Sequence, residues 1–75
     1  MKNEKNSTIS NIQTTRLIRI REVMNLVGLS KSHIYHLAAQ GRFPKSIPLV
    51  PGGTSVAWIE TEIEDFINQQ IKARG

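Results

Sequence analysis

The sequence predicts a mainly α-helical domain with a small β-hairpin wing, the arrangement of a winged helix-turn-helix. Two apolar patterns of helical spacing follow each other over residues 21–40, with Gly28-Leu29-Ser30 between them. A corner rich in Pro and Gly at residues 51–54 separates two short apolar segments, which is typical of a hairpin. A third amphipathic helix is predicted over residues 60–73.

The first helix follows a short extended lead-in at residues 17–20. It is expected to begin at Arg21 or Glu22 and to end at Gly28, which suits a left-handed cap, with Leu29 packed behind the turn. Its predicted apolar face repeats at spacings of three and four residues and consists of Val23, Leu26 and Val27.

The second helix is expected to start after Ser30, whose hydroxyl can accept a hydrogen bond from an otherwise unpaired amide of the first turn. It runs to about Gln40, and Gly41 stops it. The face predicted to meet the first helix consists of Ile34, Leu37 and Ala38. The opposite face presents Lys31, Ser32, His33, Tyr35, His36, Ala39 and Gln40. Such side chains can form hydrogen bonds with base edges and phosphates.

The hairpin is expected to consist of strands at residues 47–50 and 55–58, because the glycines at the corner supply the positive φ that a tight turn requires. The apolar side of the last helix consists of Ile59, Ile63, Phe66, Ile67 and Ile71, and its acidic residues gather in the first turns, where the helix dipole favours them. The large side chains predicted to fill the core are Phe43, Trp58 and Phe66.

The positive charge of this 75-residue chain, +4 in total, is unevenly distributed. Residues 16–45 carry six Arg or Lys residues against Glu22 alone, a net charge of +5, whereas residues 46–75 carry a net charge of −2. A basic cluster of this kind attracts a polyanion, because neutralised phosphates release condensed counterions. A solvated basic face is the alternative interpretation of the charge alone.

Composition restricts the class of protein further. Residues 1–15 contain only two large apolar side chains besides Met1, so we expect a flexible arm there and a single winged helix-turn-helix domain at residues 16–75. The chain has no Cys, which excludes disulfides and thiolate metal sites, and no apolar run of membrane-spanning length. The bacterial cytoplasm, in association with the nucleoid, is the expected location.

Neither an enzyme nor a cofactor is expected. His33 and His36 share an exposed helix face with no third metal ligand nearby, and the carboxylates lie on another element, so no convergent catalytic group is predicted. The corner at residues 51–54 lacks the Lys-Ser/Thr pair of a phosphate-binding P-loop.

Seven short motifs stand out at fixed intervals: Arg16-Leu17-Ile18, Arg21-Glu22-Val23, Gly28-Leu29-Ser30, Ile34-Tyr35, Gly41-Arg42-Phe43-Pro44-Lys45, Val56-Ala57-Trp58 and Glu62-Ile63. As a set they resemble the AlpA family of prophage regulators, small DNA-binding proteins related to phage excisionases and MerR-type regulators. The resemblance implies a MerR-like winged helix-turn-helix that switches on an integrase gene or otherwise favours excision, without enzymatic activity or cofactor. The wing departs from the family's usual Leu-Gly-Gly-Arg, because Pro51 intrudes and Thr54-Ser55 replace the arginine.

The residues predicted to contact double-stranded DNA are Ser30, Lys31, Ser32, His33, Tyr35, His36, Arg42, Lys45 and Thr54. Lys31 and Ser32 enter the groove first and are the expected base readers, while the two histidines stand where target choice should lie. Arg42 and Lys45 are expected on phosphates. The resemblance favours a phosphate contact for the Tyr35 hydroxyl, although the ring could instead cover the edge of the core.

The leading functional prediction is a sequence-specific transcriptional regulator of a prophage or integrated element, acting on DNA and through RNA polymerase. An excisionase-like factor that bends DNA for a recombinase is the first alternative, since it needs the same fold. A protein-interaction module such as an anti-repressor, binding through the acidic last helix, is the second. One module covers only part of a helical turn, so a homodimer or cooperative binding to repeated sites is also expected.

Overall fold

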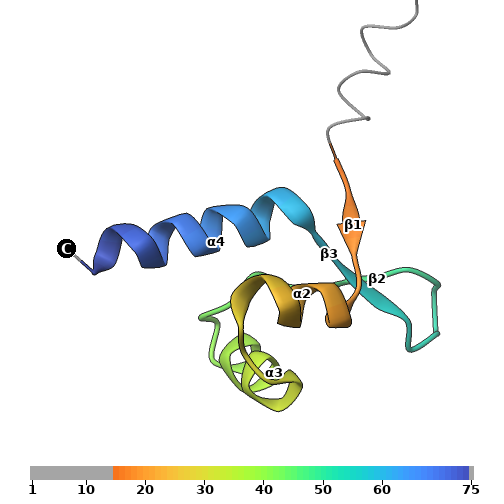
Figure 1. The fold of residues 1–75 in the computed structure, drawn as a ribbon. Coiled ribbons are helices and arrows are strands. Elements are labelled where there is room, and N and C mark those ends of the chain that lie inside the picture. The colour runs from red at the N-terminus through yellow and green to blue at the C-terminus, as the bar shows by residue number, and fades with distance from the viewer. Residues whose placement is uncertain (1–14, 75) are drawn as a thin grey trace, which may run out of the picture.

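The computed structural model describes residues 15–74 and shows three helices and three short strands (Figure 1). In chain order these are β1 (Leu17–Ile18), α2 (Ile20–Val27), α3 (Lys31–Ala39), β2 (Ile47–Pro48), β3 (Val56–Ile59) and α4 (Glu60–Ala73). The predicted fold class is confirmed. The arm predicted at residues 1–15 lies, except for Thr15, outside the described residues.

The strands form one antiparallel sheet in the order β1-β3-β2, with β3 in the centre. Ile18 of β1 is paired with Trp58, and Ile47 of β2 is paired with Ala57. The two hairpin strands differ from the predicted ranges, 47–50 and 55–58, because regular pairing stops at Pro48, opposite Val56. Beyond it the Leu49 amide still donates to the Ser55 carbonyl at 2.9 Å, but residues 49–55 form the corner rather than a ladder.

The helix ends follow the predicted capping residues. Gly28 adopts φ 73° after α2, and its amide donates to the Met24 carbonyl at 2.8 Å. The end of α3 is a Schellman motif, in which Gly41 at φ 72° and the following amide of Arg42 bond back to carbonyls of the last turn. Only the start of α2 differs, since the helix already begins at Ile20.

Helix α2 is the middle layer of the fold, with α3 on one side and α4 on the other (Figure 1). The core between these layers and the sheet consists of Ile18, Val23, Ile34, Phe43, Trp58 and Ile63. Phe66 is partly buried and packs on Phe43, with ring centroids 4.8 Å apart. The structure therefore confirms Phe43 and Trp58 as core residues and places Phe66 at its edge.

Two residues predicted to face the core are instead exposed. Leu26 is 44% exposed, because the face of α2 that packs inward contains Ile20, Val23, Met24 and Val27 and is rotated away from it. Ile71 is 51% exposed, because the last turns of α4 extend beyond the rest of the fold (Figure 1). Both predictions were wrong because helical spacing identifies an apolar face but not which part of that face the neighbouring elements cover.

Candidate nucleic-acid interface

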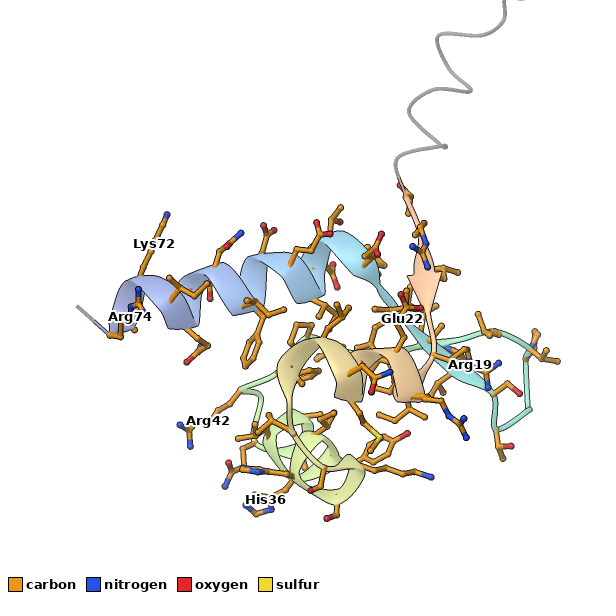
Figure 2. All side chains as sticks on the ribbon, viewed as in Figure 1. Arg19, Glu22, His36, Arg42, Lys72 and Arg74 are labelled. Carbon is orange, nitrogen blue, oxygen red and sulfur yellow. The ribbon has the colours of Figure 1, made fainter. Side chains whose placement is uncertain are left out.

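The outer face of α3 is an exposed polar surface. Ile34 is fully buried and anchors α3 to the core, while Leu37 and Ala38 pack at its edge, as predicted. In Figure 2 the labelled His36 projects from α3 away from α2 and α4. All nine candidate residues are exposed: Ser30, Lys31, Ser32, His33, Tyr35, His36, Arg42, Lys45 and Thr54.

Ser30 fixes the start of α3. Its Oγ accepts a hydrogen bond from the backbone amide of His33 at 3.2 Å, so the predicted N-cap is confirmed. The positive potential at this end of α3 has two sources, the charge of Lys31 and the positive end of the helix dipole. No acidic residue in the first turn reduces it. This end of α3 is therefore suited to an anion.

Tyr35 connects the outer face of α3 with the core. Its ring lies 6.2 Å from that of Trp58, at an interplanar angle of 51°, and the residue is still 41% exposed. The ring therefore covers the edge of the core, which was one of the two roles considered for it. A contact between its hydroxyl and a phosphate stays a prediction.

The segment after α3 presents two cations from an anchored backbone. Phe43 is buried, and the indole Nε1 of Trp58 donates to the Pro44 carbonyl at 3.1 Å. On either side of this anchor Arg42 and Lys45 are exposed, and Arg42 points away from the fold (Figure 2). The backbone between these two cations is thus attached to the core.

A groove between this segment and α4 was not foreseen from the sequence. Arg42 and Lys45 form part of one wall, and Glu62 and Asp65 form part of the other. The i, i+3 spacing of the two acidic residues puts them on one helix face, but only the Phe43–Phe66 contact shows which surface that face meets. Carboxylates so close to the two cations reduce the local positive potential.

Arg16 contributes less to the basic cluster than the sequence indicated. Its guanidinium forms ion pairs with Glu22 at 3.3 Å and with Glu60 at 3.2 Å, and so connects the residue before β1 with α2 and α4. Arg19 lies near β1, on the other side of the fold from Arg42 (Figure 2). The cations on α3 and the segment after it, Lys31, Arg42 and Lys45, thus form a group separate from Arg19. No Asp or Glu occurs in the sequence between Glu22 and Glu60, so this region carries only positive charge.

The wing carries no charge at all. Residues 46–59 include no Asp, Glu, Lys or Arg, and the corner exposes Leu49 to 39% and Val50 to 55%. Thr54 is exposed beside them, and Gly52 supplies the positive φ predicted for the turn. Any contact made by this wing uses hydroxyl, amide or apolar groups.

Other kinds of site find little support in the part of the chain that is described. Over residues 15–74 no group of three or more His, Asp or Glu residues is arranged to hold a metal ion. Within the same range, none of the helices has the length and apolar character needed to cross a membrane.

The described residues have the fold class of a small winged helix-turn-helix protein. They form three helices and a three-stranded antiparallel sheet, and the hairpin follows α3, the second helix of the helix-turn-helix. The family model described as "Prophage CP4-57 regulatory protein (AlpA)" matches residues 16–71, and the chain belongs to this family of prophage regulators. An uncharacterized protein of Enterobacteria phage P4, ORF88, is 39% identical over 66 residues, which cover 88% of this chain and 73% of that protein. No solved structure matches the chain.

Proposed function

We propose that this prophage regulator binds specific DNA sequences through the outer face of α3. The observation that carries the proposal is the run of residues 23–59, which contains no carboxylate and displays Lys31, Arg42 and Lys45 on its surface. Electrostatic attraction to phosphate is the common basis of DNA affinity. An α-helix fits the major groove, about 12 Å wide, and α3 projects on the side opposite α4 (Figure 1).

Different residues of this interface have different roles. Lys31, Ser32, His33 and His36 stand on the exposed face of α3 and can donate hydrogen bonds to base edges. Arg42 and Lys45 bind phosphates beside the groove, where they add affinity without reading sequence. Ser30, the Tyr35 hydroxyl and Thr54 are further phosphate contacts, with Ser30 acting mainly by shaping the start of α3.

Membership of the family supports a specific biological role for this binding. The chain regulates transcription in a prophage or integrated element, and its targets are genes for integration or excision. It acts in the bacterial cytoplasm on the nucleoid. RNA polymerase is the partner through which operator binding changes the transcription of the target genes. Regulation, without catalysis or a cofactor, is the proposed function.

The electrostatic part of the proposal can be tested with a random duplex of about 20 base pairs, labelled for fluorescence anisotropy. Arg42→Ala is expected to weaken binding and to reduce the slope of log affinity against log salt by about one. Lys72→Ala removes the same charge from the far end of α4 and serves as the control, with an unchanged slope (Figure 2). Equal slopes for both variants, or wild-type binding that does not depend on salt, would contradict the proposal.

A second candidate function is supported by the apolar corner of the wing. Leu49 and Val50 are exposed next to Pro51, and apolar side chains of this kind act as wedges between base steps in proteins that bend DNA from the minor groove. The chain would then be an excisionase-like factor that bends DNA for a recombinase. This candidate uses the same α3 contacts and adds a deformation of the duplex.

Mobility of complexes with circularly permuted fragments distinguishes the two functions when it is combined with a promoter reporter. The bending factor is supported if the complex bends DNA by several tens of degrees and the reporter does not respond. Leu49→Ser and Val50→Ser should then reduce the bend. A responsive reporter and an unbent complex support the transcriptional regulator.

A further inference from the structure

The last two turns of α4 carry an apolar side chain that the described fold does not cover. Helix α4 packs through the buried Ile63 and the partly buried Phe66 and Ile67, all within its first eight residues. Residues 68–74 are exposed and extend beyond α2 and α3 (Figure 1), and Ile71 among them is 51% exposed.

Ile71 belongs to a stripe of regular spacing along α4. The stripe follows intervals of four, three, four and three residues and consists of Glu60, Glu64, Ile67, Ile71 and Arg74. Residues at these intervals lie on one side of a helix and form the contact seam when two helices pair. The stripe is therefore acidic at its start, apolar in its middle and basic at its end.

This order of charge makes the stripe complementary to itself in one orientation only. When two copies of α4 lie antiparallel about a twofold axis at the level of Gln69, Ile67 of each copy lies opposite Ile71 of the other. The same register sets Glu64 of each copy opposite Arg74 of the other, which forms two symmetric ion pairs. A parallel arrangement in register would instead oppose like charges at both positions.

Helix α2 carries a second exposed apolar side chain. Leu26 is 44% exposed and lies one turn after Glu22, which shares Arg16 with Glu60 at the start of the stripe.

We propose that a second copy of this chain covers this stripe, so that the protein forms an antiparallel α4–α4 homodimer. Self-complementary charge and the exposed Ile71, next to the partly buried Ile67, support this occupant. The interface is separate from the outer face of α3, which remains free in each copy. The inference goes beyond the proposed function and does not depend on DNA, and it is tested without DNA.

Sedimentation equilibrium of the full-length protein tests the dimer through charge reversal. The wild type is expected to show a concentration-dependent mass between 8.4 kDa and twice that value. Glu64→Arg and Arg74→Glu each convert two attractive pairs into two repulsive ones, so each variant alone should weaken the dimer about tenfold or more. Both residues are exposed, so the variants keep the fold, which circular dichroism verifies.

Mixing the two variants provides the decisive arm of the experiment. A heterodimer of Glu64→Arg with Arg74→Glu has opposite charges in both pairs, so the mixture should regain the dimer that each variant lacks. Lys72→Glu is the matched control, because Lys72 is off the stripe and points away from α2 and α3 (Figure 2), and it should leave the mass unchanged. Ile71→Asp should yield a monomer.

Three results would overturn the inference. They are a wild type that stays monomeric up to about 1 mM, a dimer that survives both charge reversals, and a mixture of the two variants that remains monomeric.

Discussion

The indole Nε1 of Trp58 donates a hydrogen bond to the carbonyl oxygen of Pro44 at 3.1 Å, although the two residues are 14 positions apart. Trp58 lies on the central strand β3 and is 1% exposed, so the carbonyl is held against the centre of the sheet. Arg42 and Lys45 flank this point on the surface. One partly buried hydrogen bond therefore connects the core to the backbone between the two candidate phosphate ligands.

Trp58→Phe is expected to lower the free energy of unfolding by about 1–3 kcal/mol, because it leaves the Pro44 carbonyl without its donor and opens space in the core. Urea denaturation followed by circular dichroism measures the loss. Val50→Ala, at the exposed corner of the wing, is the control and should stay within about 0.5 kcal/mol of the wild type. An equal stability of both variants would show that the Trp58–Pro44 bond contributes nothing.

The limits of the helices could be predicted because local residues set them. Gly28, Ser30 and Gly41 each act within one turn of chain, and the structure places all three where the sequence put them. The sheet could not be predicted in full, because β1 pairs with β3 across some 40 residues and no local pattern encodes that pairing. The same holds for the ion pair between Arg16 and Glu60.

For the candidate site, the sequence predicted which side chains are exposed but not their surroundings. The helical spacing of Ile34, Leu37 and Ala38 was enough to turn the polar side of α3 outward. The contact of Tyr35 with Trp58 and the groove that Arg42 shares with Asp65 depend on how separate elements pack. Packing between elements also decided that Leu26 and Ile71 are exposed.

Ser30 allows the cap of α3 to be separated from its contact with DNA. Ser30→Ala should lower the free energy of unfolding by about 1 kcal/mol, because the His33 amide loses its acceptor. Ser30→Asp keeps an acceptor at the cap and should stay close to the wild type in stability, yet its charge should repel phosphate and weaken DNA binding. Urea denaturation and anisotropy titration measure the two effects. Unimpaired DNA binding by Ser30→Asp would show that this end of α3 does not face DNA.

Lys31 and His33 should govern specificity more than affinity in general. Alanine at either position is expected to cost about 1–3 kcal/mol at the cognate site and little on random duplex. Arg42→Ala should weaken both complexes about equally. Competition titrations with the two duplexes separate these patterns, and equal losses from all three variants would mean that α3 is not the recognition helix.

The acidic wall of the groove should oppose DNA binding. Glu62→Gln combined with Asp65→Asn removes two negative charges opposite Arg42 and Lys45, and should tighten binding about threefold or more at low salt. The gain should disappear near 0.5 M salt, where the Debye length is about 4 Å. Anisotropy at both salt concentrations measures it. A double variant that binds no better than the wild type at low salt would place the two cations away from phosphate.

The central claim, that α3 recognises a specific DNA sequence, is tested most directly by an anisotropy titration of the full-length protein. The duplexes should tile the genetic neighbourhood of its own gene, near 0.15 M salt and with excess random competitor, in parallel with Lys31→Ala. The account predicts one fragment bound at least ~10³-fold better than the competitor, with that preference reduced in the variant. Uniform affinity for every fragment, or no binding at any salt concentration, would contradict it.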